Sequence, residues 1–424
     1  MALIYKLYGM LGLRYLRQRF LTPLKVKYHI FKQPSILKRI SETKKITIFF
    51  FPINLAMWKY DSLLELLCLD DRVRVYIVPA LDPNQSKMHN QYLQNEMRRY
   101  FRDKGGCFIN GYNFETHRYF DAKLLNPDIV VFTQPYNVGH RYFKLEHYWS
   151  MSLFVYTPYG MQVENNPHFY NSLLQHIAWK YFCATTLNKI DVVRQSLVKG
   201  QNAIVVGSLL SDYFGGCMLD YRNIWKQNND QIKRVIWAPH HSINADDTLG
   251  NSMFLNIADR MLELLDNYEG KVQFAFKPHP FLKKKLYALP AWGVAKTDAY
   301  YAKWNNATNS ILVDGEYLNL FATSDALIHD CSSFTGEYLY STHPVMFLSA
   351  DDHGKQLNAF GRLCYDLHYK GSTIDDIETF INNVLLKDED VLYCERQKFW
   401  QEYLISKDEP VAKKMYKEII SIIE

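Results

Sequence analysis

The sequence lacks paired cysteines: its seven cysteines are scattered, without a CxxC pair or a histidine at metal-ligand spacing. This absence argues against a structural zinc site and is typical of buried thiols in a reducing compartment. The GxGxxG turn of a dinucleotide site is also missing, which argues against a dehydrogenase. Low hydrophobicity with high charge, the sign of disorder, is absent too, because 48% of the residues are apolar and 22% are charged.

The positive charge of the chain is concentrated at one end. Residues 1–45 carry a large excess of Lys and Arg over a single acid, Glu42, whereas the net charge of the whole chain is only +5. Residues 46–424 therefore carry a net negative charge, which excludes a uniformly basic nucleic-acid-binding surface. We expect no nucleic-acid partner.

Residues 1–45 alternate basic side chains with apolar ones such as Leu3, Leu7 and Leu11. This pattern predicts an amphipathic helix that lies on an anionic membrane surface. Charges interrupt every apolar run that could reach the roughly 18 residues of a spanning helix, and no signal-peptide cleavage site is visible. We expect a cytoplasmic protein, peripheral on the inner face of the plasma membrane. The alternative is a helix that packs on the adjoining domain.

Strands and helices alternate along most of the chain. Residues 46–195 contain apolar strand-length runs in KITIFFFPIN, VRVYIVPAL, DIVVFTQP and SLFVYTPYG, with helical stretches between them. A second alternation over residues 196–372 begins at NAIVVGSLL and continues through RVIWAP, VQFAFKP, DALIH and PVMFLS. This rhythm predicts an α/β fold with two Rossmann-like parallel-sheet domains, followed by C-terminal helices over residues 373–424.

Polar residues follow three strands of the second predicted domain. In open parallel sheets, ligands bind beyond the carboxyl ends of the strands. The candidate residues there are His240, His241 and Ser242 after the first strand, His279 after the next, and Asp330, Ser332 and Ser333 after a third. We therefore expect these side chains to converge on one site.

Two of these elements suit a phosphate. Ser332 and Ser333 stand at a strand-to-helix turn, where backbone N–H groups can bind an anion, although a serine there can also simply cap the helix. His279 stands between Pro278 and Pro280, which restrict the backbone on both sides. A rigidly held imidazole can donate to a phosphate or stabilise a leaving nucleotide.

His240 and His241 are candidates for a general base, because the pKa of histidine lies near neutral pH. Adjacent residues of an extended segment point to opposite faces. We therefore expect only one of the two imidazoles to face the site, and no metal to be bound by the pair.

The segments WAPHHSI, FKPHP and DALIHDCSSFTGEYLYSTHPVMFL, in this order, resemble the CDP-glycerol:poly(glycerophosphate) glycerophosphotransferase family, which builds teichoic acids and related capsule polymers. MWKYDSL, DIVVFTQPY and YTPYGM add a weaker similarity, so that the resemblance covers roughly residues 46–350. It implies a GT-B fold: two Rossmann-like domains facing across a cleft, with the nucleotide on the C-terminal domain, the acceptor on the N-terminal one, and no metal or other cofactor.

The resemblance also implies roles for individual residues. His279, Ser332 and Ser333 would bind the donor pyrophosphate, Asp330 would order their turn, and Glu337 would bind a ribose hydroxyl. Further donor-binding candidates are Lys277, Pro239, Ser242, Gly207 and Asp212, and the acceptor-side candidates are Tyr156, Tyr159 and Gly160.

The sequence departs from the family at the proposed base. The family's His-Gly-Thr segment is replaced by Tyr156 to Gly160, and its Ala-Pro-Thr segment by Ala238, Pro239 and His240. His241 is therefore our first candidate for the base, followed by Asp61 and His240.

The predicted reaction transfers a polyol phosphate, glycerol phosphate first, from a CDP-activated donor to a hydroxyl of a membrane-linked surface polymer such as teichoic acid, capsule or O-antigen, with release of CMP. The alternatives are a GT-B glycosyltransferase that uses a nucleotide sugar in surface polysaccharide synthesis, a nucleotide-sugar 2-epimerase, and an inactive scaffold with the same fold.

Overall fold

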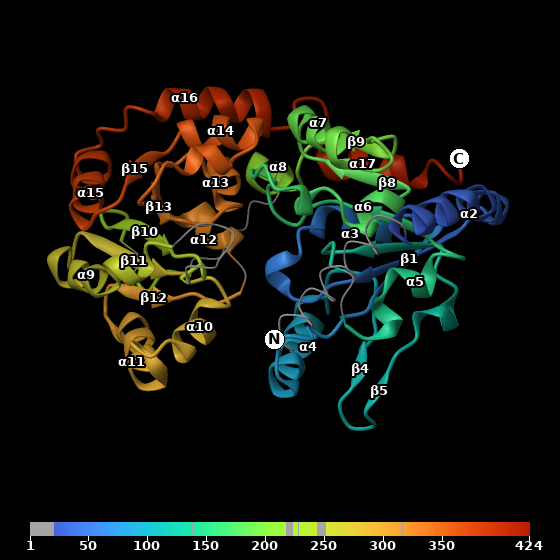
Figure 1. Cartoon of the computed structure of the whole chain (residues 1–424), viewed down its shortest axis with the longest axis horizontal. Helices are drawn as coiled ribbons and strands as arrows, with labels where there is room; N and C mark the ends of the chain where they lie inside the picture. Colours follow the sequence, from blue (N-terminus) through green and yellow to red (C-terminus); the bar gives the residue numbers. More distant parts are fainter. Residues whose placement is uncertain (1–20, 137–138, 218–223, 228, 244–251, 316) are drawn as a thin grey trace, which may run out of the picture. The chain divides into compact units, whose positions relative to one another are not determined.

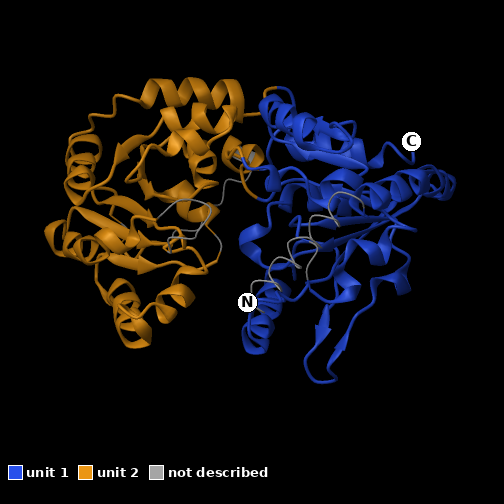
Figure 2. Cartoon of the chain, in the orientation of Figure 1, with its two compact units in different colours: residues 1–159, 166–209, 408–424 blue, residues 160–165, 210–407 orange. Residues whose placement is uncertain are grey.

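The computed structural model describes residues 21–136, 139–217, 224–227, 229–243, 252–315 and 317–424 (Figure 1). The chain forms two compact units (Figure 2). Unit 1 contains the described residues up to 159 together with 166–209 and 408–424, and unit 2 contains residues 160–165 and the described part of 210–407.

Unit 1 is built on a seven-stranded parallel sheet with the strand order β3-β2-β1-β6-β7-β8-β9. The strands are β1 (Ile46–Phe51), β2 (Val73–Ile77), β3 (Cys107–Phe108), β6 (Ile129–Phe132), β7 (Leu153–Tyr156), β8 (Lys180–Cys183) and β9 (Ala203–Val205). Central strands such as β6 and β7 are buried along their whole length, as expected where helices cover both faces of a sheet. A small antiparallel hairpin, β4 (Tyr112–Asn113) with β5 (Arg118–Tyr119), stands apart from the sheet.

The main helices of unit 1 are α2 (Thr22–Thr43), α3 (Asp61–Leu69), α4 (Lys87–Tyr100), α7 (Thr186–Gln195) and α17 (Val411–Ile420). The buried side of α2 includes Ile36 and Ile40, which join the apolar cluster under the sheet. Arg39 of α2 pairs with Asp128 at 2.7 Å. The described part of the basic segment therefore packs on unit 1, as the alternative interpretation of residues 1–45 predicts; residues 1–20 lie outside the described residues.

Unit 2 is built on a six-stranded parallel sheet with the order β12-β11-β10-β13-β14-β15. The strands are β10 (Lys233–Ala238), β11 (Val272–Phe276), β12 (Ser310–Leu312), β13 (Ala326–His329), β14 (Val345–Leu348) and β15 (Tyr369–Gly371). The chain adds strands on one side of β10 through β12 and then returns to the other side with β13. The switch point of the sheet, where ligands of such folds bind, therefore lies between β10 and β13.

The helices of unit 2 are α8 (Leu210–Asp212), α9 (Phe254–Asn267), α10 (Leu282–Ala288), α11 (Gly293–Asn306), α12 (Leu318–Thr323), α13 (Phe334–Glu337), α14 (Ala359–Asp366), α15 (Ile374–Thr379) and α16 (Tyr393–Phe399). The helix α9 and the α10–α11 pair bury apolar side chains against β10 and β11, in a cluster around Trp237 and Trp304. Among the described residues no helix is both long and apolar enough to cross a membrane.

Two parallel-sheet units confirm the predicted fold class, but the domain boundaries differ from the prediction. NAIVVGSLL does not open the second unit: β9 pairs with β8 and completes the first sheet, because α7 connects the two strands as a crossover helix. The boundary therefore lies after residue 209 and not at 195.

The predicted C-terminal helical segment, residues 373–424, is not a separate unit. Residues up to 407 belong to unit 2, whereas α17 returns to unit 1. There Val411, Met415 and Ile419 are buried in the same apolar cluster as α3, and the Tyr416 hydroxyl donates to Asp70 at 2.7 Å. An apolar helical face finds its partner wherever a complementary surface is exposed, and helical periodicity alone does not reveal which one.

Candidate active site

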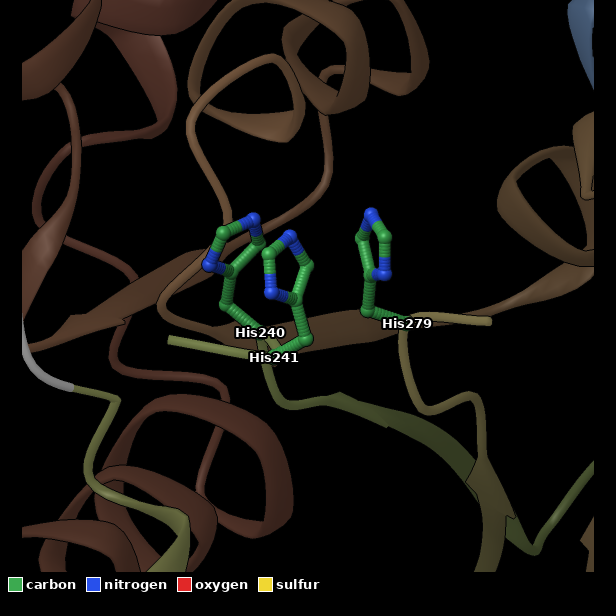
Figure 3. Close-up of side chains that lie close together, drawn as sticks. All are labelled: His240, His241 and His279. Atoms are coloured by element: carbon green, nitrogen blue, oxygen red, sulfur yellow. The ribbon is translucent and has the colours of Figure 1, made fainter. Parts of the chain in front are cut away.

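Three histidines meet at the carboxyl ends of β10 and β11, beside the switch point of unit 2. His240 and His241 follow β10, and His279 follows the neighbouring strand β11. The ring centroid of His241 lies 4.2 Å from that of His240 and 4.2 Å from that of His279. Figure 3 shows the three imidazoles side by side and pointing to the same side of the ribbon. The sequence prediction that these strand ends converge is therefore confirmed for the histidines.

The prediction that His240 and His241 face opposite ways is wrong. It assumed an extended backbone, but the chain turns directly after β10: the N–H of Ile243 donates to the carbonyl of His241 at 2.9 Å. In a turn the side chains of neighbouring residues no longer alternate, so both rings reach His279.

Hydrogen bonds hold the backbone of the two histidine segments together. The N–H of His279 donates to the carbonyl of Pro239 at 3.0 Å, and the N–H of His240 donates to Oδ1 of Asp330 at 2.5 Å. Ser242 is buried and lies 2.9 Å from Nδ1 of His240, through its Oγ. Pro239 and Ser242 therefore contribute to the site as supports of the histidines.

The carboxylate of Asp330 joins three segments of unit 2. Besides His240, it accepts hydrogen bonds through Oδ2 from Ser252 Oγ at 2.6 Å and from the N–H of Met253 at 2.9 Å. Burial raises the pKa of Asp330, while these donors act in the opposite direction. The resemblance implied that Asp330 orders the serine turn; its side chain instead orders the turn of His240 and the segment before α9.

The proton position on His279 follows from its surroundings. The N–H of Phe281 donates to Nδ1 of His279 at 3.1 Å, so Nδ1 must be the acceptor and Nε2 carries the hydrogen of the neutral ring. Burial, followed by the neighbouring His241 and His240, lowers the pKa of His279 to about 2. The ring is therefore neutral at pH 7 and presents Nε2–H as a donor.

The histidine cluster also has the spacing of a metal site. One ring nitrogen of each histidine lies within 4.8 Å of those of the other two. A metal ion needs a free lone pair on each ligand nitrogen, whereas the lone pair of His279 already accepts from Phe281. The donor chemistry of His279 therefore suits a phosphate oxygen better than a cation, and the absence of a metal cofactor stays a prediction.

The predicted serine turn lies at the carboxyl end of β13, the strand beside β10. Ser333 is the residue before α13, and its side chain makes no capping hydrogen bond, so capping does not explain it. The helix α13 has only four residues before it tightens into a 3₁₀ segment, Tyr338–Ser341, and its dipole is correspondingly small. The binding of an anion at this turn would therefore depend mainly on hydrogen bonds from nearby N–H and hydroxyl groups.

A segment from the first half of the sequence covers this turn. Residues 160–165 belong to unit 2, and a Cβ placed on Gly160 would lie 3.2 Å from Cβ of Ser333. Glu164 is 3% exposed; burial raises its pKa, and a hydrogen bond from Ser332 lowers it. Gly160, predicted on the acceptor side, therefore lies with the donor-side residues. Sequence reasoning missed Glu164, since a lone acid outside a strand end carries no distinctive signal.

Glu337 already has protein partners for both carboxylate oxygens. Oε1 accepts from the N–H of Met161 at 3.4 Å, and Oε2 accepts a short hydrogen bond from the hydroxyl of Tyr317. The side chain is 1% exposed. A ribose hydroxyl would reach Glu337 only by replacing one of these bonds.

The remaining donor-side predictions are divided between the two units. Lys277 is buried and donates from Nζ to the carbonyl of Gly315 at 3.1 Å. Asp212 is buried in α8 of unit 2. Gly207 lies in unit 1 with a φ of +102°, where a Cβ would meet Val411 at 2.7 Å, so it is explained by close packing on α17.

The other predicted residues belong to unit 1. Tyr156 is buried in β7, and the hydroxyl of Tyr159 lies 3.2 Å from that of Tyr136. Asp61, a candidate base, accepts from Trp58 Nε1 at 2.7 Å and from Lys104 Nζ at 2.6 Å. The carboxylate of Asp61 therefore has a structural role, because it already accepts these two hydrogen bonds. His241 remains the better candidate for the base.

Two units, each built on a parallel sheet covered by helices, are typical of the GT-B class of fold. Solved structures of this class match the chain over nearly its whole length. The wall teichoic acid polymerase TagF, solved as a variant, is 12% identical, with coverage of 97% of this chain and 98% of that chain and a TM-score of 0.57. MnaA of S. aureus, solved with UDP, is 13% identical, with 89% and 97% coverage and a TM-score of 0.55.

The UDP-GlcNAc 2-epimerase of Neisseria meningitidis, bound to UDP-GlcNAc, is 14% identical, with coverage of 89% of this chain and 100% of that chain and a TM-score of 0.50. Neither the protein-family models nor the curated proteins contain a match. At such identities the similarity establishes the fold alone.

Proposed function

We propose that this protein transfers a polyol phosphate, glycerol phosphate first, from a CDP-activated donor to a hydroxyl of a cell-surface polymer and releases CMP. The observation that carries the proposal is the neutral His279 imidazole, whose Nε2–H is available to an anion at the switch point of the sheet. The similarity to a wall teichoic acid polymerase supports a polymer-building enzyme of this fold.

The site can hold a diphosphate through neutral donors. Oriented N–H groups stabilise developing charge without reorganising during the reaction. His279, after β11, would supply one such donor, and the serine turn after β13, on the other side of β10, would supply others. The backbone N–H of His279 donates a hydrogen bond to the carbonyl of Pro239, and this bond helps to keep the Nε2–H donor of the ring in place.

In the proposed step the acceptor hydroxyl oxygen attacks the distal phosphorus of the donor. A new P–O bond forms, and the bond from that phosphorus to the bridging oxygen breaks. The bridging oxygen and the electron pair leave with CMP. The hydroxyl proton passes to a base, for which we propose His241, because its ring lies beside that of His279.

We also propose that the enzyme works at an anionic membrane surface, where a membrane-linked acceptor is available. The outer side of α2 exposes Leu24 at 62% and Phe31 at 78%, beside the lysines Lys27 and Lys32. Exposed apolar side chains flanked by lysines are typical of a helix that lies in a lipid interface.

The experiment that tests the proposal offers purified protein CDP-glycerol, CDP-ribitol, UDP-GlcNAc and UDP-glucose in separate reactions, each with a membrane-derived polymer acceptor. Acceptor-dependent release of CMP from a CDP-polyol is the expected result. Release of UDP from a nucleotide sugar would instead support the glycosyltransferase alternative. Conversion of UDP-GlcNAc to its 2-epimer without any acceptor would support an epimerase, the activity named for the structure from Neisseria meningitidis.

A further inference from the structure

Unit 2 contains a cavity whose lining shares no residue with the histidine site. Its volume is about 290 Å³, and its aromatic walls are Phe214, Tyr340 and Trp400. Residues 341–343 form another wall and lead directly into β14. The cavity therefore lies toward the amino ends of the parallel strands, whereas His240 and His279 follow carboxyl ends.

The described residues that line this cavity carry no formal charge. They include no Lys, Arg, Asp or Glu, and the polar ones include Ser341, Thr342 and Gln397. Phosphates and nucleotides are usually held by cations or by several oriented N–H groups, so they are poor candidates for this lining. Aromatic faces with neutral hydrogen-bonding groups are suited to an uncharged ligand that has both apolar and hydroxyl surfaces.

Two polar atoms in these walls lack hydrogen-bond partners among the described residues: Nδ1 of His343 and Nε1 of Trp400. The indole N–H is always a donor. The His343 ring hydrogen-bonds the backbone of Ser324, and burial lowers its pKa. With that bond made by Nε2–H, Nδ1 is left as an acceptor.

Buried polar atoms without partners are uncommon in native proteins and call for a water molecule or a ligand. A donor and an acceptor in the same walls can both be satisfied by one hydroxyl group, which accepts from the indole and donates to the imidazole. Both atoms are covered by protein in this structure, so a ligand hydroxyl can reach them only when neighbouring side chains of the wall move aside.

We propose that this cavity is a binding site for one uncharged, hydroxyl-bearing unit of sugar or polyol. A volume of about 290 Å³ accommodates a unit of this size. The proposal goes beyond the transfer reaction and does not depend on which nucleotide donor the enzyme uses.

Saturation-transfer NMR tests the proposal on the full chain with glycerol, ribitol, glucose, galactose and N-acetylglucosamine as probes. The expected result is transfer to at least one probe, unchanged by saturating CMP, because the proposed nucleotide site lies at the carboxyl ends of the strands and this cavity lies toward their amino ends. Trp400→Phe keeps an aromatic wall but removes the N–H. It should lower the affinity for that probe by about tenfold. The matched control is Tyr393→Ala, an exposed aromatic on α16, which should bind as the unaltered protein does.

Three outcomes would overturn the inference: no transfer to any probe, equal transfer in Trp400→Phe, or displacement of the probe by CMP. Thermal melting of each variant confirms folding. Acceptor-dependent CMP release is measured on the same samples, so a failure of this site is distinguishable from a failure of the proposed reaction.

Discussion

The N–H of Phe281 donates a hydrogen bond to Nδ1 of His279 at 3.1 Å, and this bond determines which ring nitrogen faces the ligand site as a donor. Pro280 between the two residues keeps their geometry rigid. The chemistry proposed for the site depends on this pair, because a backbone N–H can only donate and therefore leaves the ring hydrogen on Nε2.

Replacing His279 by Ala should reduce acceptor-dependent CMP release by on the order of 10²-fold, since an oriented donor to the leaving phosphate is lost. The measurement is kcat and KM for the CDP-polyol, with melting temperature as the check on folding. His168→Ala serves as the control, because His168 is exposed in unit 1. Full activity in His279→Ala would remove the central assignment.

Removal of metals should leave the activity unchanged. Binding of a cation by all three histidines would require Nδ1 of His279 to give up its hydrogen bond from Phe281, or Nε2 to lose its proton. We therefore expect EDTA to have no effect on CMP release and purified protein to contain far less than one zinc ion per chain by mass spectrometry. Stoichiometric zinc that disappears in His279→Ala would contradict this prediction.

Membrane association should depend on the exposed side of α2. The double variant Leu24→Glu with Phe31→Glu replaces apolar contacts by charges that an anionic surface repels, and should weaken binding by about tenfold or more. Co-sedimentation with vesicles that contain phosphatidylglycerol measures this effect. The control is Leu124→Glu, which alters an equally exposed apolar residue elsewhere in unit 1. Equal binding by both variants would show that α2 does not contact the bilayer.

The sheet strands and their polar ends could be predicted from sequence because each buried strand is a continuous apolar run that stops at a polar residue. RVIWAP before His240 and DALIH before Asp330 are examples, and the structure places both at the switch point. The turn after β10 could not be predicted in the same way. It depends on Asp330, 90 residues away along the chain, which holds the N–H of His240.

The domain boundaries and the position of residues 160–165 could not be predicted from sequence either, because they too depend on contacts between distant segments. Nothing local to Glu164 indicates that it belongs with Ser332, since that assignment depends on where the chain crosses between units. The sequence of the π-helical segment Phe380–Leu386 likewise predicts only a helix, because an extra residue in a helical turn has little effect on the apolar pattern.

Gly361 should be intolerant of alanine even though it lies inside a helix. In an exposed helix this change would stabilise by up to about 1 kcal/mol. Here a Cβ would lie 2.0 Å from the carbonyl oxygen of Val163, which also accepts the N–H of Asn358. We expect Gly361→Ala to destabilise the protein by about 1–3 kcal/mol, because residues 160–165 must then move away from α14.

Thermal unfolding followed by circular dichroism measures the effect of Gly361→Ala. Leu363→Ala, on a more exposed position of the same helix, should change stability less. If Gly361→Ala were more stable than the unaltered protein, residues 160–165 would not pack on α14 as the structure has them.

The stability of the protein should fall as the pH drops below about 6.5. Burial lowers the pKa of His329 to about 3, and Nε2 of its ring has no partner among the described residues that could stabilise a charge. The unfolded chain takes up a proton near pH 6.5, whereas the folded chain resists it until about pH 3, so stability is lost progressively across this interval. At pH 4.5 this single residue accounts for about 3 kcal/mol. Melting temperatures between pH 7.5 and 4.5 should therefore fall less steeply in His329→Leu than in the unaltered protein or in His168→Leu, and parallel curves for all three would show that His329 is protonated in the folded state without penalty.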